Sequence, residues 1–200
     1  MPVLVRGKSS TICFFHIPKT GGTYVGECLQ KFSNGKWIAA TPDINRRHGL
    51  PRHFKVEFDV SLVTIRHPVE WHRSWWCWLQ RTTIPIPENW HPLTDLWCFK
   101  GVTFDEYVDD VPEGFVGRLY REYATDRQIV IKTDQLTENL IAVLTDHRVQ
   151  FDESGLRRYP RVNVSASWEV PEECARVILE KEREALKIWK RGRIVDAGAL

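Results

Sequence analysis

Short apolar segments alternate along the chain with segments of helical spacing. The apolar segments are rich in β-branched and aromatic residues and end near charged residues, proline or glycine. They predict three buried strands, at 11–16, 60–65 and 127–132. Apolar residues that recur every three or four positions predict four helices, at 23–32, 69–81, around 136–144 and at 171–191. Because strands alternate with helices, we expect an α/β fold in three layers, with a parallel sheet between flanking helices.

Residues that cap or break helices agree with these boundaries. Pro68 suits the first position of the second helix, because its fixed φ fits a helix start. Thr133 or Asp134 can cap the third helix, and Gly192 can end the last one. A chain of 200 residues can bury about 70% of its unfolded surface, so we expect residues 1–200 to form a single domain.

Composition and charge are those of an ordinary globular protein. Apolar residues make up 42% of the chain and charged residues 27%, which excludes intrinsic disorder. The net charge of +2 gives no general attraction to nucleic acid or to a membrane surface. No apolar run exceeds five residues, so no transmembrane helix is expected, and the first residues lack the pattern of a signal peptide. We therefore expect a cytoplasmic or soluble protein with no nucleic-acid partner; the alternative is a chain from which a targeting segment has been removed.

The spacing of the cysteines bears on metal sites and disulfides, and the tryptophans form a cluster in the sequence. The five cysteines are widely spaced and contain no C-x-x-C pair, which argues against a zinc site and a disulfide framework and favours reduced, mostly buried thiols. Six of the nine tryptophans lie between positions 71 and 97. They form either a core of helix and loop or a wall against which a sugar or an aromatic acceptor stacks. The proline-rich stretch 82–112 predicts an excursion from the sheet with one short helix near 103–108.

A loop with the features of an anion site joins the first strand to the first helix. Its residues are Pro18, Lys19, Thr20, Gly21, Gly22 and Thr23. Glycines allow a ligand to approach the backbone, a helix N-terminus presents N–H groups without helical partners, and the lysine adds a positive charge. The lysine precedes the glycine pair, so this is not a Walker A loop. The alternative is a tight turn with an exposed lysine.

A second candidate site follows the second strand. Arg66 ends that strand, and Ser74 lies about two turns into the helix that begins after Pro68. Both can face the crevice at the carboxyl ends of parallel strands, where a guanidinium fork suits a phosphate group. The alternative is that Arg66 pairs with a carboxylate and Ser74 has no binding role.

Two of these segments carry a resemblance to a known family. Residues 14–23, FFHIPKTGGT, resemble the 5′-phosphosulfate loop of the sulfotransferases that use 3′-phosphoadenosine 5′-phosphosulfate (PAPS), in particular the branch with glycan O-sulfotransferases. Residues 63–74 are similar to that family's 3′-phosphate segment, whose arginine and serine match Arg66 and Ser74. His67 stands where the family usually has Asp or Asn. Weaker likenesses are at 131–136 and 162–165.

The resemblance implies a P-loop-NTPase-like sulfotransferase fold and a reaction. A sulfuryl group would pass in line from PAPS to a hydroxyl or amine of an acceptor, with carbohydrate as one candidate, and 3′-phosphoadenosine 5′-phosphate (PAP) would be released. Lys19 would lie near the bridging oxygen, and backbone N–H groups of residues 20–23 would hold the 5′-phosphate. The transferred group carries less negative charge than a phosphoryl group and no acidic cluster accompanies the loop, so we expect no metal.

A hydroxyl acceptor needs a general base. The resemblance favours His48, then His53, because related enzymes place a catalytic histidine in the corresponding interval; a solvated histidine in a basic loop is the alternative for each. Glu57 and Asp59 are the candidates if the base is a carboxylate. A later basic run, Arg157, Arg158 and Arg161, can close over the 3′-phosphate, meet an anionic acceptor, or be a solvated loop.

Two other functions compete with sulfuryl transfer. A nucleotide kinase on a P-loop-like fold is disfavoured by the missing Walker A order. A regulatory module that binds the nucleotide without catalysis would keep the anion loop. A transfer assay beside a binding measurement separates these functions.

Overall fold

A five-stranded sheet is the centre of the molecule. The computed structural model describes residues 2–38, 48–83, 92–161 and 168–191. The strands are β1 (Val3–Arg6), β2 (Thr11–Phe15), β3 (Lys36–Trp37), β4 (Val60–Ile65) and β5 (Gln128–Lys132). Their order across the sheet is β3-β1-β2-β4-β5.

The sheet is only partly parallel, which corrects the expectation of a parallel sheet. Strand β2 pairs in parallel with β4, and β4 with β5, as the alternation of strands and helices predicts. Strands β1 and β3 were not predicted, and β1 pairs antiparallel with both β2 and β3. The short turn between β1 and β2, in which Gly7 N donates to the Ser10 carbonyl oxygen at 2.9 Å, permits only the antiparallel arrangement.

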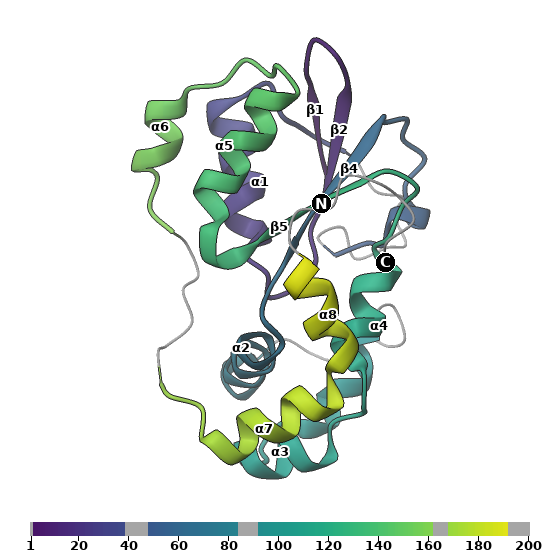
Figure 1. Cartoon of the computed structure of the whole chain (residues 1–200), viewed down its shortest axis with the longest axis vertical. Helices are drawn as coiled ribbons and strands as arrows, with labels where there is room; N and C mark the ends of the chain where they lie inside the picture. The colour runs from purple at the N-terminus through teal and green to yellow at the C-terminus, as the bar shows by residue number, and fades with distance from the viewer. Residues whose placement is uncertain (1, 39–47, 84–91, 162–167, 192–200) are drawn as a thin grey trace.

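Helices cover both faces of the sheet (Figure 1). One face carries α1 (Gly22–Phe32), α5 (Leu136–Asp146) and α6 (Glu153–Arg158). The other carries α2 (Pro68–Arg81), α3 (Phe104–Asp110), α4 (Phe115–Glu122), α7 (Glu172–Lys181) and α8 (Arg183–Arg191). Three 3₁₀ helices complete the described elements: η1 (Pro51–His53), η2 (Pro92–Phe99) and η3 (Thr133–Gln135). The three-layer α/β arrangement is therefore confirmed.

The parallel strands are apolar along their whole length because both of their faces are covered. Phe14, Leu62 and Ile129 point into the core beneath α1 and α5. Their neighbours Phe15 and Val63 point into the opposite core, beneath α2 and α4. Alternate residues of a strand face opposite sides of the sheet, so each of these strands serves both cores.

The predicted helix at 171–191 is two helices that meet at Glu182. This residue departs from helical geometry, with φ −106° and ψ 34°, and its side chain is fully buried. The carboxylate turns inward and accepts hydrogen bonds from two backbone N–H groups of α4, a helix that was also not predicted. Helical spacing continues through Glu182, so the sequence pattern does not reveal the break. Gly192 lies outside the described residues.

Burial agrees with the expectation for the cysteines, since Cys13, Cys28, Cys77 and Cys174 are buried and free and Cys98 is exposed and free. Trp71, Trp75 and Trp97 are buried, which favours the core interpretation for that part of the tryptophan cluster.

The excursion predicted at 82–112 holds η2 as well as the expected short helix, which is α3. Across the described ranges, no helix combines the length and apolar character needed to cross a membrane.

Candidate anion-binding site

The loop between β2 and α1 has the backbone of an open helix start. Lys19 and Gly21 both lie in the left-handed region, with φ 65° and 82°. Gly21 is the N-cap of α1 and offers no side chain to the N–H groups of the first turn. Those N–H groups have no partner within the helix and point beyond its start. A glycine is required at position 21 by its φ, whereas the lysine adopts this strained conformation at a cost.

Hydrogen bonds within the loop, from β4 and from α2 hold the loop. The buried Thr20 hydroxyl donates to the Ile17 carbonyl oxygen at 2.7 Å and lies 2.6 Å from the Thr64 hydroxyl of β4. Trp71 of α2 donates its indole N–H to the Pro18 carbonyl oxygen at 2.9 Å. The Thr20 side chain therefore has a structural role, and only its backbone N–H is directed to ligand binding in our prediction.

Position 22 requires a glycine because of a neighbouring side chain, and not because of the close approach of a ligand that the sequence predicts. A Cβ atom at this position would lie 2.0 Å from Cδ2 of His16, because the imidazole packs directly on the first turn of α1. The missing side chain therefore admits a histidine of the same loop rather than a ligand. Thr23 follows as the second residue of α1 and is half-buried.

Lys19 is partly buried beside α2, where its Nζ lies 5.5 Å from the centre of the Trp78 ring. Burial first, and the positive charge of Arg66 second, lower the pKa of Lys19 to about 8. The lysine is therefore neither fully solvated nor paired with a carboxylate among its described contacts. This corrects the alternative of a tight turn with an exposed lysine.

Arg66 brings the second predicted motif to the first. Its Nη1 donates to the Lys19 carbonyl oxygen at 3.3 Å, so the end of β4 and the loop after β2 are directly linked. Its Nη2 lies 3.6 Å from Oε2 of Glu70, a carboxylate that also pairs with Arg73. Arg66 therefore does contact a carboxylate, which was the alternative for this residue. The contact is long, however, and Glu70 is shared with Arg73. Burial lowers the pKa of Arg66, while Glu70 opposes this.

Ser74 lies on α2 and is only 2% exposed. Helical spacing places it on the same side of α2 as Trp71 and Trp78, which contact the loop. By helical spacing, Ser74 therefore lies on the side of α2 that contacts the loop, and its binding role stays a prediction.

The two candidate histidines occupy different places. The His48 ring packs edge-on against His16, with ring centres 4.5 Å apart, and its Nδ1 lies 3.4 Å from the His16 carbonyl oxygen. His48 is therefore adjacent to the start of the loop. His53 ends η1, and its Nδ1 accepts the Leu50 N–H at 3.2 Å; burial and Arg52 lower its pKa. Within the described part of the chain, the contact of the His53 ring is to the backbone of its own turn and not to the loop.

The carboxylate alternatives for the base are at the wrong edge of the sheet. Asp59 precedes β4 and accepts the Thr11 N–H at 2.7 Å, so it lies at the amino end of the parallel strands. Strand β4 has six residues, which separates Asp59 from Arg66 by about 20 Å. Glu57 lies two residues earlier and is exposed. Asp59 is therefore wrong as a candidate base, and the position of Glu57 does not favour it.

Arg157 and Arg158 of the basic run lie on a helix, whereas Arg161 follows that helix in a loop. Arg157 of α6 pairs with Glu138 and Glu153, and the Arg161 guanidinium donates to the Asp134 carbonyl oxygen at 3.2 Å. Arg157 and Arg161 line a recess of about 400 Å³ together with residues of η3 and α5. The charge of Arg157 is thus largely matched by its two acidic partners. Residues 162–167, which include the weaker family likeness, lie outside the described residues.

Several residues contribute to this edge of the sheet in ways that the sequence analysis did not predict. The Thr133 hydroxyl lies 3.1 Å from the Thr20 carbonyl oxygen and 2.8 Å from that of Ile65, so it joins the ends of β5, β4 and the loop instead of capping α5. The centre of the Trp189 ring, on α8, lies 4.8 Å from the centre of the His67 ring and 4.3 Å from Nζ of Lys132. Trp189 therefore lies across the carboxyl ends of β4 and β5. The helical spacing of 171–191 gave no sign of this contact.

Two cations, an open helix start and the carboxyl ends of parallel strands therefore meet at one place. Such an arrangement can bind a phosphate or sulfate group. Among the described residues, no group of three or more His, Cys, Asp or Glu side chains could hold a metal ion. Comparison with known proteins finds no matching family model, no matching curated protein and no matching solved structure.

Proposed function

We propose that the protein is a sulfotransferase that moves the sulfuryl group of PAPS to a hydroxyl or amine of an acceptor. The proposal combines the likeness of two sequence segments to the PAPS-dependent family with their arrangement in space. Residues 18–23 would hold the 5′-phosphosulfate, and Arg66 with Ser74 would hold the 3′-phosphate. The acceptor class stays open, with carbohydrate as one candidate.

The observation that carries the proposal is that the side chains of Lys19 and Arg66, both positively charged, lie close to each other. Two partly buried cations from different motifs lie close enough for the charge of one to lower the pKa of the other. Like charges in such surroundings repel each other, and an anion placed between them would remove that cost. PAP carries two phosphate groups and so offers one anion to the helix start and one to Arg66.

The chemistry assigns one task to each group. As the bond between sulfur and the bridging oxygen breaks, the Lys19 ammonium stabilises the negative charge left on PAP. A new bond forms between sulfur and the acceptor oxygen, and the acceptor's proton passes to His48, which lies at the start of the loop. His48 is preferred over His53 because only His48 contacts the loop among their described contacts.

The test is a transfer assay with radiolabelled PAPS across a panel of sugar, peptide and phenol acceptors, run beside calorimetry with PAP. Labelled product from at least one acceptor is expected. Tight PAP binding without transfer would favour the regulatory module, and binding of neither PAPS nor PAP would overturn the proposal. Phosphoryl transfer from ATP would support the kinase instead.

The Arg66→Ala variant tests the proposed role of Arg66 in binding the 3′-phosphate. A buried charge-assisted hydrogen bond contributes about 1.5–3 kcal/mol, so Arg66→Ala should weaken PAP binding by about 10- to 150-fold. Binding of adenosine 5′-phosphate (AMP), which lacks only the 3′-phosphate, should hardly change. Equal losses for PAP and AMP would contradict the assignment of Arg66.

A further inference from the structure

Two buried tyrosines near the end of α4 contact the two candidate functional segments. Tyr120 lies in the last turn of the helix, and Tyr123 is its C-cap residue. The Tyr120 hydroxyl bonds with the backbone of Arg66, and the Tyr123 hydroxyl donates to the His48 carbonyl oxygen at 2.7 Å. Neither tyrosine belongs to a segment that resembles the sulfotransferase family.

The contact of Tyr120 engages both polar groups of one residue. Its hydroxyl accepts the Arg66 N–H at 3.1 Å and donates to the Arg66 carbonyl oxygen at 2.6 Å. Arg66 is the first residue after β4, where strand hydrogen bonding stops. The phenol thus replaces the neighbouring strand that would otherwise hold this residue. Burial raises the pKa of Tyr120, so the hydroxyl keeps the proton that it donates.

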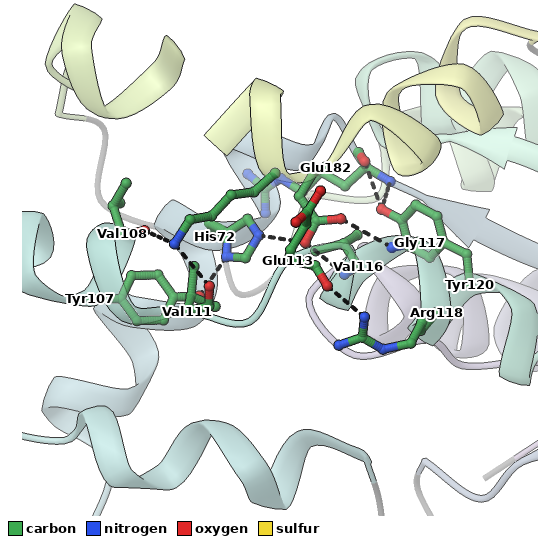
Figure 2. Close-up of polar contacts among 12 residues, drawn as sticks. His72, Tyr107, Val108, Val111, Glu113, Val116, Gly117, Arg118, Tyr120 and Glu182 are labelled. Atoms are coloured by element: carbon green, nitrogen blue, oxygen red, sulfur yellow. Dashed lines mark hydrogen bonds and ion pairs between the residues drawn. The ribbon is translucent and has the colours of Figure 1, made fainter. Parts of the chain in front are cut away.

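The other end of α4 is fixed by Glu182. Its carboxylate accepts the Val116 N–H at 2.9 Å and the Gly117 N–H at 3.2 Å, which are N–H groups of the first helical turn. Figure 2 shows the Glu182 carboxylate between His72 and these residues of α4. A buried carboxylate at a helix N-terminus matches the charge of the helix dipole. The position of α4, and with it the position of Tyr120, is therefore strongly determined.

We infer that Tyr120 is a positioning residue for donor recognition: it fixes the backbone of Arg66 so that the guanidinium lies where the 3′-phosphate binds. The inference rests on the proposed function, because it assigns a purpose to Arg66 that only an anionic ligand would use. Without the two hydrogen bonds, the Arg66 backbone could rotate after the end of β4, and the guanidinium would sample positions away from the ligand.

The test is Tyr120→Phe, which removes the hydroxyl and keeps the ring in the core. PAP binding should weaken by about 5- to 20-fold, since two hydrogen bonds of ordinary net strength are lost, while AMP binding changes by less than about twofold. The matched control is Tyr123→Phe, which removes a buried hydroxyl at the same end of α4 that bonds with His48. It should cost similar thermal stability and leave the ratio of PAP to AMP affinity unchanged.

A double-mutant cycle separates positioning from general damage. If Tyr120 acts through Arg66, then Tyr120→Phe in the Arg66→Ala background should change PAP affinity by less than about twofold. An undiminished effect in that background, equal losses of PAP and AMP affinity, or a normal PAP-to-AMP ratio for Tyr120→Phe would each overturn the inference. If Arg66→Ala itself leaves the ratio unchanged, the proposed 3′-phosphate site fails first, and the two failures are thus distinguishable.

Discussion

Both the backbone conformation and the surroundings of Lys19 are unfavourable in free energy. Its backbone is in the left-handed region, which disfavours residues with a Cβ atom, and its ammonium is partly buried close to another cation. Neither cost helps the fold, because a glycine would relieve the first and an uncharged side chain the second. Costs of this kind persist where a residue serves function, so Lys19 is the residue that we most expect to act on the ligand.

A pH profile tests this role. The ammonium must be charged to stabilise the leaving group, and its pKa is about 8, so kcat/KM for PAPS should fall as the pH rises through about 8. The Lys19→Ala variant should lose at least about 10²-fold in turnover below pH 8, where the wild-type lysine is charged, and the difference should shrink at higher pH, while its melting temperature stays equal or rises. A flat profile from pH 7 to 10, or turnover of the variant within threefold of the wild type below pH 8, would contradict the assignment.

The two histidines give a second prediction at this scale. His48→Ala should lower kcat by about 10²–10⁴ and leave PAP binding nearly intact, because His48 is at the start of the loop and its proposed partner is the acceptor. His53→Ala is the control, since the described contact of its ring is to the backbone of its own turn. Normal turnover of the His48 variant would remove it as the base.

Among the elements, α1 depends on the packing of His16 against its first turn. Gly22→Ala would place a methyl group 2.0 Å from the imidazole of His16, which is confined by the His48 ring. Overpacking of this kind costs about 1–3 kcal/mol, so the variant should unfold at lower urea concentration and bind PAP more weakly.

Gly26→Ala is the matched control on the same helix. Its new methyl group would meet the end of the Trp37 ring at 2.8 Å, and that ring is 38% exposed and able to move. The gain in helix propensity of about 1 kcal/mol offsets the contact, so stability should change little. If Gly22→Ala is as stable as Gly26→Ala, then His16 does not constrain the loop.

Sequence pattern predicted the elements that begin or flank the site and missed those that fix it. Strands β2 and β4 were predictable because both of their faces are apolar. Lys19 and Arg66 were predictable because Lys19 lies in the loop that follows β2 and Arg66 directly follows β4. Strand β1 is a three-residue apolar run before Arg6, which is too short to distinguish from a loop. Tyr120 could not be found, because its partner Arg66 is distant in sequence and the contact is to the backbone.

For the molecule as a whole, Glu182 is the junction of the helical layer over one face of the sheet. His72 of α2 lies between Tyr107 of α3, at 2.5 Å from its hydroxyl, and the Glu182 carboxylate, at 3.2 Å. The arrangement that satisfies every group has the Tyr107 hydroxyl donating to Nδ1 and a neutral imidazole donating from Nε2. The side chains of Glu182 and His72 together therefore connect α2, α3, α4 and the α7–α8 corner (Figure 2).

Removal of that carboxylate should be costly. Glu182→Ala would leave buried N–H groups of Val116 and Gly117 and the His72 ring without their acceptor, so we expect about 3 kcal/mol or more of lost stability in urea unfolding followed by tryptophan fluorescence. Glu180→Ala, which removes an exposed pair with Arg176, should cost less than about 1 kcal/mol. Equal midpoints for both variants would show that the buried network adds nothing to stability.

The corner at Glu182 also has a consequence for how a ribosome delivers this chain. The parallel ladders join segments distant in sequence, with Ile12 opposite Val60 and Ser61 opposite Gln128, so the central sheet cannot close until β5 has been synthesised. Helix α4 emerges before β5, but the carboxylate that satisfies its first turn emerges only with Glu182. A nascent chain that has just released β5 would hold Lys19 and Arg66 in a sheet whose supporting helix is still unanchored. Ligand binding should therefore be among the last properties that the growing chain acquires.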